Sequence, residues 1–221
     1  MTQDIVYEPG KTNHGLKFDP FKSCVVPRAI GWISTRSSGG IDNLAPYSQF
    51  TNVTYDPPTI LFAANRTPEG TSKDSVTNAR DTGEFVWNLA TWSLRGAVNA
   101  TAEYVRPEVD EFVLAGLDKA PSERVKVPRV AASPIHFECT VLDIVQVPGN
   151  GPEGSADVVF GRVVLVHIAP WALTNDGRID VLKIKPIARM GYFDYTVVES
   201  SFEMVIPGDP RILKGLEGKA T

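Results

Sequence analysis

Hydroxyl and cationic side chains are concentrated in one segment of the chain, which reads TPEGTSKDSVTN. Thr71, Ser72 and Ser75 supply hydroxyl donors, and Lys73 supplies a positive charge directly before a predicted helix. Hydrogen-bond donors, a cation and the positive end of a helix dipole are the parts of an anion site. The segment therefore predicts binding of an anionic group. Simple helix capping by Ser72 or Asp74 explains the same residue types, and both interpretations stay open on the residues alone.

Two further segments carry residue types that suit a ligand. The run NLAPYSQFTN at positions 43–52 places small, amide and hydroxyl residues between apolar stretches. Such a run can bring backbone N–H and C=O groups up to a planar heteroaromatic ring, although an ordinary strand pair with a polar outer face has the same pattern. The run ARMGYFDY at 188–195 places Arg189 beside a glycine and two tyrosines. A surface arginine stacked on an aromatic ring is the alternative there.

The motifs of several enzyme classes are missing from the sequence. It contains no P-loop and no G-x-S-x-G, and its G-x-G-x-x-G at 149–154 lies in a predicted turn between two strands, with no predicted helix after it. His14, His136 and His167 share no metal-ligand spacing, so no metal site is expected. Cys24 and Cys139 are expected to be two buried thiols rather than a disulfide. A Ser/His/Asp triad is not a local pattern, but nothing points to one. We therefore expect no catalytic side chain and a bound cofactor that carries the reaction.

Short strands separated by turns are expected to position these segments. Strands are predicted at 24–35, 41–52, 59–64, 84–90, 135–147 and 157–168, and helices at 74–82 and 93–104. The chain has 18 Gly and 17 Pro among 221 residues, above the ordinary combined share of about 12%. Strands and helices do not alternate regularly, so an antiparallel barrel or sandwich is favoured over a doubly wound sheet.

Composition limits the class of protein further. The formal net charge is -4, which argues against nucleic acid as a partner. No secretion signal and no membrane-spanning stretch are visible, so a soluble cytoplasmic protein is expected. With 43% apolar residues the chain can form one packed domain over 1–221. Residues 1–20 and 207–221 are expected to be peripheral tails.

In this order the segments resemble a known family. PRAIGWIST, then GGIDNLAPYSQFTNVTYDPPTILFA, then SKDSVTNARDTGEFVWNLA are similar to the flavin reductase-like, FMN-binding split-barrel family. That family includes flavoredoxin-like proteins and the reductase components of two-component flavin monooxygenases. The resemblance covers about residues 20–195. It implies a mainly β fold, a six-stranded antiparallel Greek-key split barrel with short inserted helices, and a homodimer with FMN at or near the interface.

The resemblance also implies which residues bind FMN. The expected cofactor-binding residues are Arg28, Trp32, Ser34, Ala45, Pro46, Tyr47, Ser48, Gln49, Phe50, Asn52, Thr71, Ser72, Lys73, Asp74, Ser75, Asn78, Arg189, Gly191 and Tyr192. Residues 45–50 would line the isoalloxazine, largely through backbone, and 72–75 would surround the phosphate. Because the whole chain is acidic, its positive charge is expected to gather locally at Arg28, Lys73 and Arg189.

The implied activity is an FMN-dependent reductase. A hydride would pass from NADH or NADPH to FMN, and reduced flavin would serve an acceptor or a partner monooxygenase. One departure bears on this, because several such reductases carry a histidine early on the long late strand. Here Asp157 or Val158 occupies that neighbourhood, and His167 lies about ten residues further on. A flavin-binding electron carrier or flavin store without nicotinamide activity is therefore the alternative. A split-barrel protein that binds no flavin is the third possibility.

Overall fold

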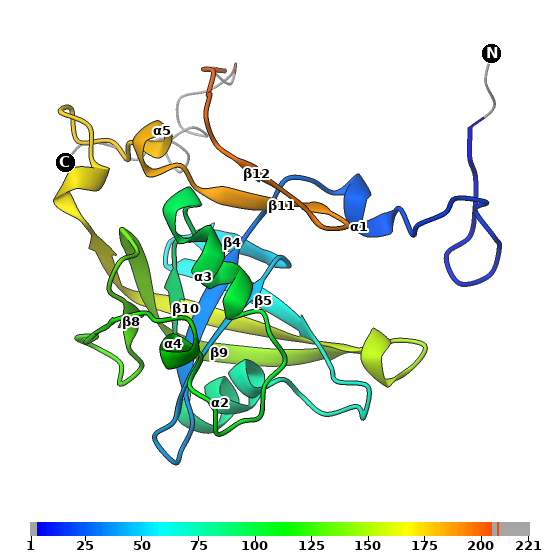
Figure 1. Cartoon of the computed structure of the whole chain (residues 1–221), viewed down its shortest axis with the longest axis horizontal. Helices are drawn as coiled ribbons and strands as arrows, with labels where there is room; N and C mark the ends of the chain where they lie inside the picture. Colours follow the sequence, from blue (N-terminus) through cyan, green and yellow to red (C-terminus); the bar gives the residue numbers. More distant parts are fainter. Residues whose placement is uncertain (1–3, 205–206, 208–221) are drawn as a thin grey trace.

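A curled antiparallel sheet of seven strands forms the body of the protein. The computed structural model describes residues 4–204 and 207 of the chain. The sheet order is β3-β2-β6-β9-β10-β5-β4 (Figure 1). Its strands are β2 (Gly31–Arg36), β3 (Asp42–Tyr47), β4 (Phe50–Tyr55), β5 (Pro58–Asn65), β6 (Glu84–Asn88), β9 (Ile135–Val147) and β10 (Ala156–Ile168). The mainly β fold predicted from the sequence is confirmed.

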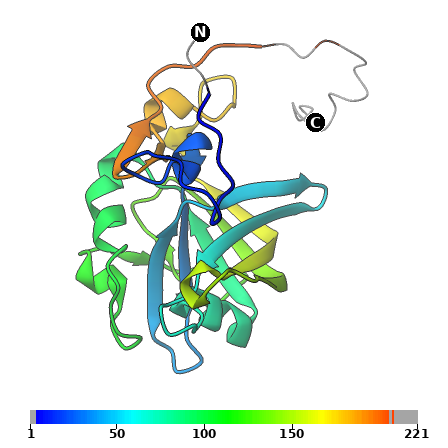
Figure 2. The same cartoon turned by 90° about the vertical axis from the view of Figure 1, so that its right-hand side faces the viewer.

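The two outermost strands of the sheet, β3 and β4, are consecutive in the chain. Only Ser48 and Gln49 separate them, and the Gln49 carbonyl accepts a hydrogen bond of 2.8 Å from the Ala63 N–H on β5. The chain therefore turns from one edge of the sheet to the other at this corner, and the sheet curls into a barrel-like body (Figure 2). We call residues 45–49 the β3–β4 corner. The single strand expected over 41–52 is divided there, so the sheet has seven strands rather than six.

A second, small sheet packs beside the barrel. It has the order β1-β11-β12, with β1 (Arg28–Ala29), β11 (Ile187–Gly191) and β12 (Asp194–Val197). Arg28 is directly opposite Arg189 in the β1–β11 register. A third pair consists of β7 (Lys119–Ala120) and β8 (Arg129–Val130). The β1–β11 pairing brings a late segment of the chain back to an early one.

Short helices fill the connections. They are α1 (Phe21–Cys24), α2 (Asp74–Thr82), α3 (Arg95–Ala100), α4 (Glu111–Leu114) and α5 (Val181–Ile184), with 3₁₀ turns at Trp92–Leu94, Pro152–Gly154 and Pro170–Ala172. The predicted helix at 74–82 is confirmed to the residue. Gly83 follows its last residue, Thr82, and has a φ of 74°, a conformation that glycine adopts without strain. Val76 and Ala79 of α2 are fully buried in the main core.

Two other predicted elements have different bounds. Cys24, the first residue of the predicted strand at 24–35, is the last residue of helix α1. Strand pairing begins only at Arg28. The predicted helix at 93–104 is a 3₁₀ turn followed by α3, which ends at Ala100. Thr101 follows α3 and accepts a hydrogen bond of 2.9 Å from the Trp32 indole, so a tertiary contact occupies the next position. Such contacts between distant segments override local helix preference.

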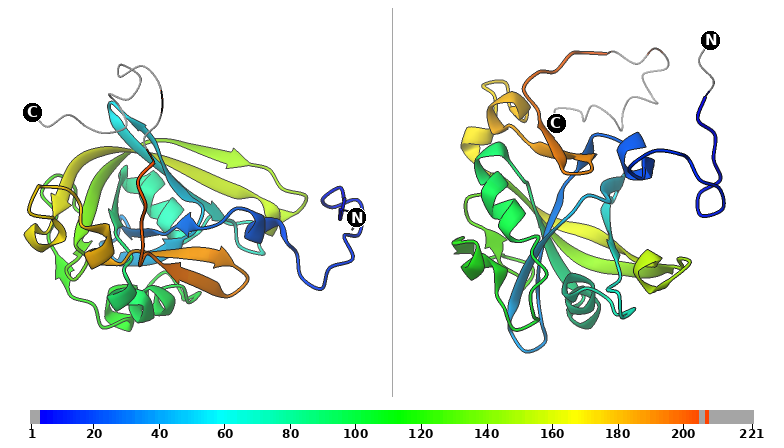
Figure 3. Two further views of the ribbon diagram at one scale, coloured as in Figure 1. Left: turned by 90° about the horizontal axis from the view of Figure 1, so that it is seen from above. Right: turned by 45° about the vertical axis from the view of Figure 1, so that its right-hand side comes forward.

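The chain before α1 extends away from the sheet (Figure 3). Most of residues 4–20 are exposed, as expected of a peripheral segment. The expected tail at 207–221 lies outside the described residues except for Pro207. Over residues 4–204 no helix is long and apolar enough to cross a membrane.

Candidate functional site

A pocket of about 340 Å³ lies between the β3–β4 corner, β5 and the small sheet. Its wall consists of Lys22, Arg28, Ile30, Pro46, Tyr47, Ser48, Gln49, Ala63, Asn65, Lys73, Ala102, Arg189, Gly191, Tyr192 and Tyr195. We call it the cationic pocket, because four of these side chains are cationic and none is a carboxylate. Although the whole chain has a net charge of -4, the charged side chains of this wall are all positive. The pocket therefore favours an anionic ligand. The expected gathering of Arg28, Lys73 and Arg189 is confirmed.

The two arginines of the pocket are held from behind by backbone carbonyls. The Arg28 guanidinium donates to the Val25 carbonyl at 2.7 Å and also to the Lys22 carbonyl. The Arg189 guanidinium donates to the Tyr192 carbonyl and lies 4.6 Å from the centroid of the Tyr195 ring. These contacts fix both cations without neutralising them.

Lys73, the residue directly before α2, forms part of the pocket wall. Its backbone is extended, with φ -65° and ψ 155°, and it occupies the N-cap position of the helix. Its ammonium lies 4.2 Å from the centroid of the Tyr104 ring. Within the described part of the chain Lys73 forms no ion pair. A cation and a helix N-terminus therefore meet at one edge of the pocket.

A smaller recess of about 170 Å³ lies on the other side of Pro46, Tyr47 and Lys73. Its wall also contains Asn43, Ala45, Asp74, Ser75, Thr101, Ala102, Glu103, Tyr104, Val105 and Glu111. Burial raises the pKa of the Tyr47 phenol to about 12. Burial also raises the pKa of Asp74 and of Glu111. Tyr47 is therefore a neutral hydrogen-bonding group at physiological pH.

A buried hydrogen-bond network supports β3 beneath this recess. Glu111 accepts from the Leu44 N–H at 3.0 Å and from the Asn43 amide at 2.8 Å. The Ser75 hydroxyl donates to the Asn43 side chain at 2.7 Å. Three elements, β3, α2 and α4, are thereby joined through one asparagine, which gives the β3–β4 corner a rigid base.

Comparison with known proteins identifies the fold and the family. Residues 23–182 match the family model described as the flavin reductase like domain. The chain belongs to the flavin reductase-like family. An uncharacterized protein of Halalkalibacterium halodurans is 37% identical over 183 residues, which are 83% of this chain and 87% of that protein.

Solved structures agree with the family assignment. Component B of nitrilotriacetate monooxygenase from Bacillus cereus has a TM-score of 0.84 and 29% identity, covering 92% of this chain and 100% of that one. The 2-nitrobenzoate 2-nitroreductase of Pseudomonas fluorescens has a TM-score of 0.77 and 25% identity, covering 91% and 95%. Flavoredoxin of Desulfovibrio vulgaris, at 17% identity, covers 81% and 91% with a TM-score of 0.70, and shares the fold.

The structure brings most of the residues expected from the flavin reductase resemblance together. Those on the wall of the cationic pocket are Arg28, Pro46, Tyr47, Ser48, Gln49, Lys73, Arg189, Gly191 and Tyr192. Those on the wall of the smaller recess alone are Ala45, Asp74 and Ser75. Four separate stretches of the chain, around 28, 45–49, 73–75 and 189–192, therefore converge on the two adjoining cavities.

Three expected residues have side chains that are buried and bonded within the protein, and a part for them in flavin binding stays a prediction. The Trp32 side chain is fully buried and donates to Thr101. The Ser34 hydroxyl is buried and donates to the Pro128 carbonyl at 2.7 Å. The Asn78 amide is buried and donates to the Thr35 hydroxyl at 3.2 Å. In each case the polar group already has a protein partner.

Four more expected residues lie outside both cavities. Phe50 stacks on the Trp87 ring, with centroids 5.5 Å apart, as part of the main core. Asn52 is exposed along β4, and the Thr71 hydroxyl pairs with Thr67 at 2.8 Å. The Ser72 hydroxyl donates to Asp157 at 2.8 Å. It does not cap the N-terminus of α2.

Asp157 has a structural role that the sequence did not indicate. Its carboxylate is buried and forms an ion pair of 2.8 Å with Arg66. Burial by itself raises the pKa of Asp157, but the hydrogen bonds from Arg66 and Ser72 outweigh it and lower the pKa. The carboxylate holds the 66–72 loop against β10 and does not border the cationic pocket.

Sequence reasoning also missed residues of the pocket. Lys22, Ile30, Ala63, Asn65, Ala102 and Tyr195 complete its wall. Tyr195 belongs to the ARMGYFDY run, so extending the arginine prediction along that strand would have found it. The others carry no local signal, because only the tertiary fold brings their strands, α1 and the segment after α3 together. Within residues 4–204 no cluster of three or more metal-ligating side chains occurs, and the sequence predicted no metal site.

Proposed function

We propose that this protein binds FMN in the cationic pocket and the adjoining recess. The observation that carries the proposal is the pocket wall, where four cations and three tyrosines occur without a carboxylate. A flavin mononucleotide combines a planar ring with a phosphate of about -1.5 to -2 charges, so it matches both kinds of wall. A phosphate needs charged donors and a ring needs flat apolar neighbours, and the side chains present supply both.

The residues have distinct proposed roles. Lys73 and the N-terminus of α2 hold the phosphate, with Arg28 or Arg189 as a second donor. The β3–β4 corner faces the ring with backbone groups, and the neutral Tyr47 phenol packs beside it. The network through Asn43 keeps that corner in place. For Asn52, Thr71 and Ser72, which lie outside both cavities, FMN binding stays a prediction from the family resemblance.

When bound, FMN supplies hydride acceptance at N5 from NADH or NADPH. The residues of this chain provide binding, orientation and exclusion of water rather than an acid or base. The raised pKa of Tyr47 keeps that phenol from acting as a proton acceptor. The reduced cofactor would serve an acceptor, in keeping with the similar protein of Bacillus cereus that is described as component B of nitrilotriacetate monooxygenase.

We further propose a homodimer with FMN at or near the interface. The hairpin of β9 and β10 exposes apolar side chains at both of its ends, Val145 and Val147 near one end and Val164, Val166 and Ile168 near the other. Exposed apolar groups on a sheet face are typical of a protein–protein interface when they form a patch. Sedimentation equilibrium of the purified protein measures the oligomeric state, and a monomer at all concentrations contradicts this part of the proposal.

The absorbance spectrum of the purified protein, before and after addition of FMN and gel filtration, tests cofactor binding. Retained flavin bands are expected, and a colourless protein after this treatment refutes the proposal. The same sample is then mixed with NADH or NADPH. Oxidation that depends on FMN supports a reductase. Bound FMN without oxidation of either nicotinamide identifies an electron carrier, the alternative motivated by the buried Asp157 where several reductases of the family carry histidine.

A further inference from the structure

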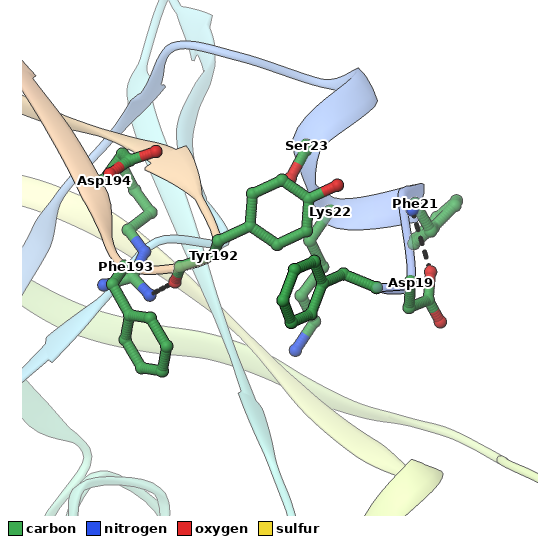
Figure 4. A pocket seen from close by; sticks show the side chains of 9 residues that line it. Asp19, Phe21, Lys22, Ser23, Tyr192, Phe193 and Asp194 are labelled. Atoms are coloured by element: carbon green, nitrogen blue, oxygen red, sulfur yellow. Dashed lines mark hydrogen bonds between the residues drawn. The ribbon is translucent and has the colours of Figure 1, made fainter. Parts of the chain in front are cut away.

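A second and larger pocket, of about 830 Å³, lies beside the cationic pocket. We call it the aromatic pocket, and Figure 4 shows its wall. The wall consists of Phe18, Asp19, Phe21, Lys22, Ser23, Arg189, Tyr192, Phe193 and Asp194. It is formed by the segment leading into α1 on one side and by the turn between β11 and β12 on the other. Of this wall, only Arg189 has a proposed role above, as an alternative to Arg28 at the phosphate.

The two pockets share Lys22, Arg189 and Tyr192. Tyr192 has a φ of 45°, which a non-glycine residue adopts only at a cost, and Gly191 before it has a φ of 100°. A Cβ at Gly191 would lie 2.2 Å from the Ser23 hydroxyl, so α1 and the turn are in close backbone contact. The strained turn therefore holds the Tyr192 ring on the wall that both pockets share (Figure 4).

The outer part of the aromatic pocket exposes aromatic rings to solvent. Phe18, Phe21 and Phe193 are 58%, 65% and 93% exposed, and the Phe18 and Tyr192 rings lie 5.7 Å apart at 58°. Exposed aromatic rings that converge on a cavity mark a binding site for an apolar, flat group. A planar ring that enters between Phe18 and Tyr192 gains contact with both.

The wall of the aromatic pocket carries two cations and two carboxylates. Lys22 and Arg189 also belong to the wall of the cationic pocket, whereas Asp19 and Asp194 do not. The Asp19 carboxylate accepts the Phe21 N–H at 2.9 Å and is thus used to start α1 (Figure 4). Among residues 4–204 Lys22 forms no ion pair. A ligand whose ring lies among the aromatic side chains therefore meets a cation with its inner end.

We propose that the aromatic pocket binds a small aromatic carboxylic acid as a second ligand beside the cofactor. Its ring packs against Phe18, Tyr192 and Phe193, and its carboxylate pairs with Lys22 and Arg189. Placement beside a flavin rests on the proposed function, whereas binding of the acid itself rests only on this pocket.

Calorimetric titration with benzoate tests the inference, on flavin-free and on FMN-loaded protein. Benzyl alcohol is the uncharged control ligand and cyclohexanecarboxylate the non-aromatic one. Saturable binding of benzoate is expected, and the Kd of each control ligand is expected to be about tenfold higher. One charge-assisted contact or one aromatic pair changes a Kd by up to roughly that factor. FMN binding is measured separately by flavin absorbance, so failure of the cofactor proposal and failure of this one are distinguishable.

Two variants locate the binding. Phe18→Ala is expected to raise the Kd of benzoate about two- to tenfold. Lys22→Met is expected to raise it about tenfold while leaving benzyl alcohol unaffected. The exposed Phe202 and Lys126 lie outside the pocket, and their variants Phe202→Ala and Lys126→Met serve as matched controls.

Three outcomes overturn the proposal. The first is no saturable benzoate binding to either form of the protein. The second is equal benzoate affinity in Phe18→Ala, Lys22→Met and the control variants. The third is NADH or NADPH binding that Phe18→Ala weakens while benzoate does not bind, which assigns the pocket to the nicotinamide.

Discussion

Replacement of Lys73 by methionine isolates the phosphate contact proposed for FMN. The side chain keeps its length and loses its charge, and α2 keeps its start because no side chain of residue 73 caps it. A unit charge pair about 4 Å apart contributes about 4 kcal/mol at an effective dielectric constant of about 20. Since Lys73 is only half-buried, solvent screening reduces this to about 1.5–3 kcal/mol, the usual range for a hydrogen bond to a charged group.

The expected result is selective for the phosphate. A loss of about 1.5–3 kcal/mol raises the Kd of FMN about 10- to 150-fold. Riboflavin has the same ring and no phosphate, so its Kd is expected to stay within about twofold, well under the loss set by a charged contact. Quenching of flavin fluorescence on titration with protein measures both constants, and raising the salt concentration should weaken FMN binding more in the parent protein than in the variant.

Lys126→Met is the matched control, because Lys126 is exposed and lies outside both cavities. Equal weakening of FMN and riboflavin in Lys73→Met would show that Lys73 supports the ring or the fold rather than the phosphate. Unchanged FMN affinity would remove Lys73 from the site altogether. Either result refutes the assignment of the α2 N-terminus as the phosphate end of the pocket.

Three further predictions concern stability and titration. Gly31→Ala is expected to lower the free energy of unfolding by about 1–3 kcal/mol, since the new Cβ would lie 2.7 Å from the Phe50 ring; urea denaturation measures this. The pKa of Asp157 is lowered on folding by its Arg66 partner, so its contribution is present above the usual aspartate pKa and is lost as the pH falls through the lower folded value. Urea denaturation of Asp157→Asn should therefore show lower stability at neutral pH and a smaller loss on acidification. Burial raises the pKa of the Tyr47 phenol to about 12, so an ultraviolet titration should show a step near that pH that Tyr47→Phe removes.

Each of these has an outcome that contradicts it. Gly96 lies in α3, and no atom comes within 4 Å of the point that a Cβ at this residue would occupy. Gly96→Ala is therefore the control for Gly31→Ala, and equal effects would show that contact with Phe50 is not the cause. Parallel stability curves for Asp157→Asn and the parent over acidic pH would exclude a stabilising ion pair. Tyr47→Phe that leaves the late titration step in place would assign that step to another tyrosine.

Local patterns predicted the elements whose signals are themselves local. The helix at 74–82 has an acidic first residue and a glycine in left-handed conformation after its last turn, and both residues stand in the sequence. Strand β9 has the predicted bounds, and β10 begins one residue before the predicted 157, because long alternating stretches on either side of a glycine-rich turn define a hairpin. The corner at Ser48–Gln49 was missed, since neither residue is a glycine or proline.

The candidate site was predicted only in part because strand residues alternate between two faces. The family resemblance implied Trp32 and Ser34 of β2 as cofactor-binding residues, and in the structure both side chains are buried with protein partners. The face that a side chain occupies depends on which neighbour each strand acquires, and a single sequence does not contain that register. The same limit applies to Asp157, which the sequence showed only as a departure from the family's histidine and whose carboxylate holds a loop in the structure.

The sequence indicated Arg28 and Arg189 as residues of one site but not how they come together. Their positions, far apart in the chain, become directly opposite in the β1–β11 register. Like charges directly opposite in antiparallel strands are destabilising, and here the backbone carbonyls that accept from them leave both charges intact. A bound anion between these arginines and Lys73 would offset that repulsion. The binding free energy of the anion would therefore include relief of the repulsion between the two guanidinium groups. The acidic composition predicted that such a cluster must be local, and only the small sheet could show that it is built from an early and a late segment of the chain.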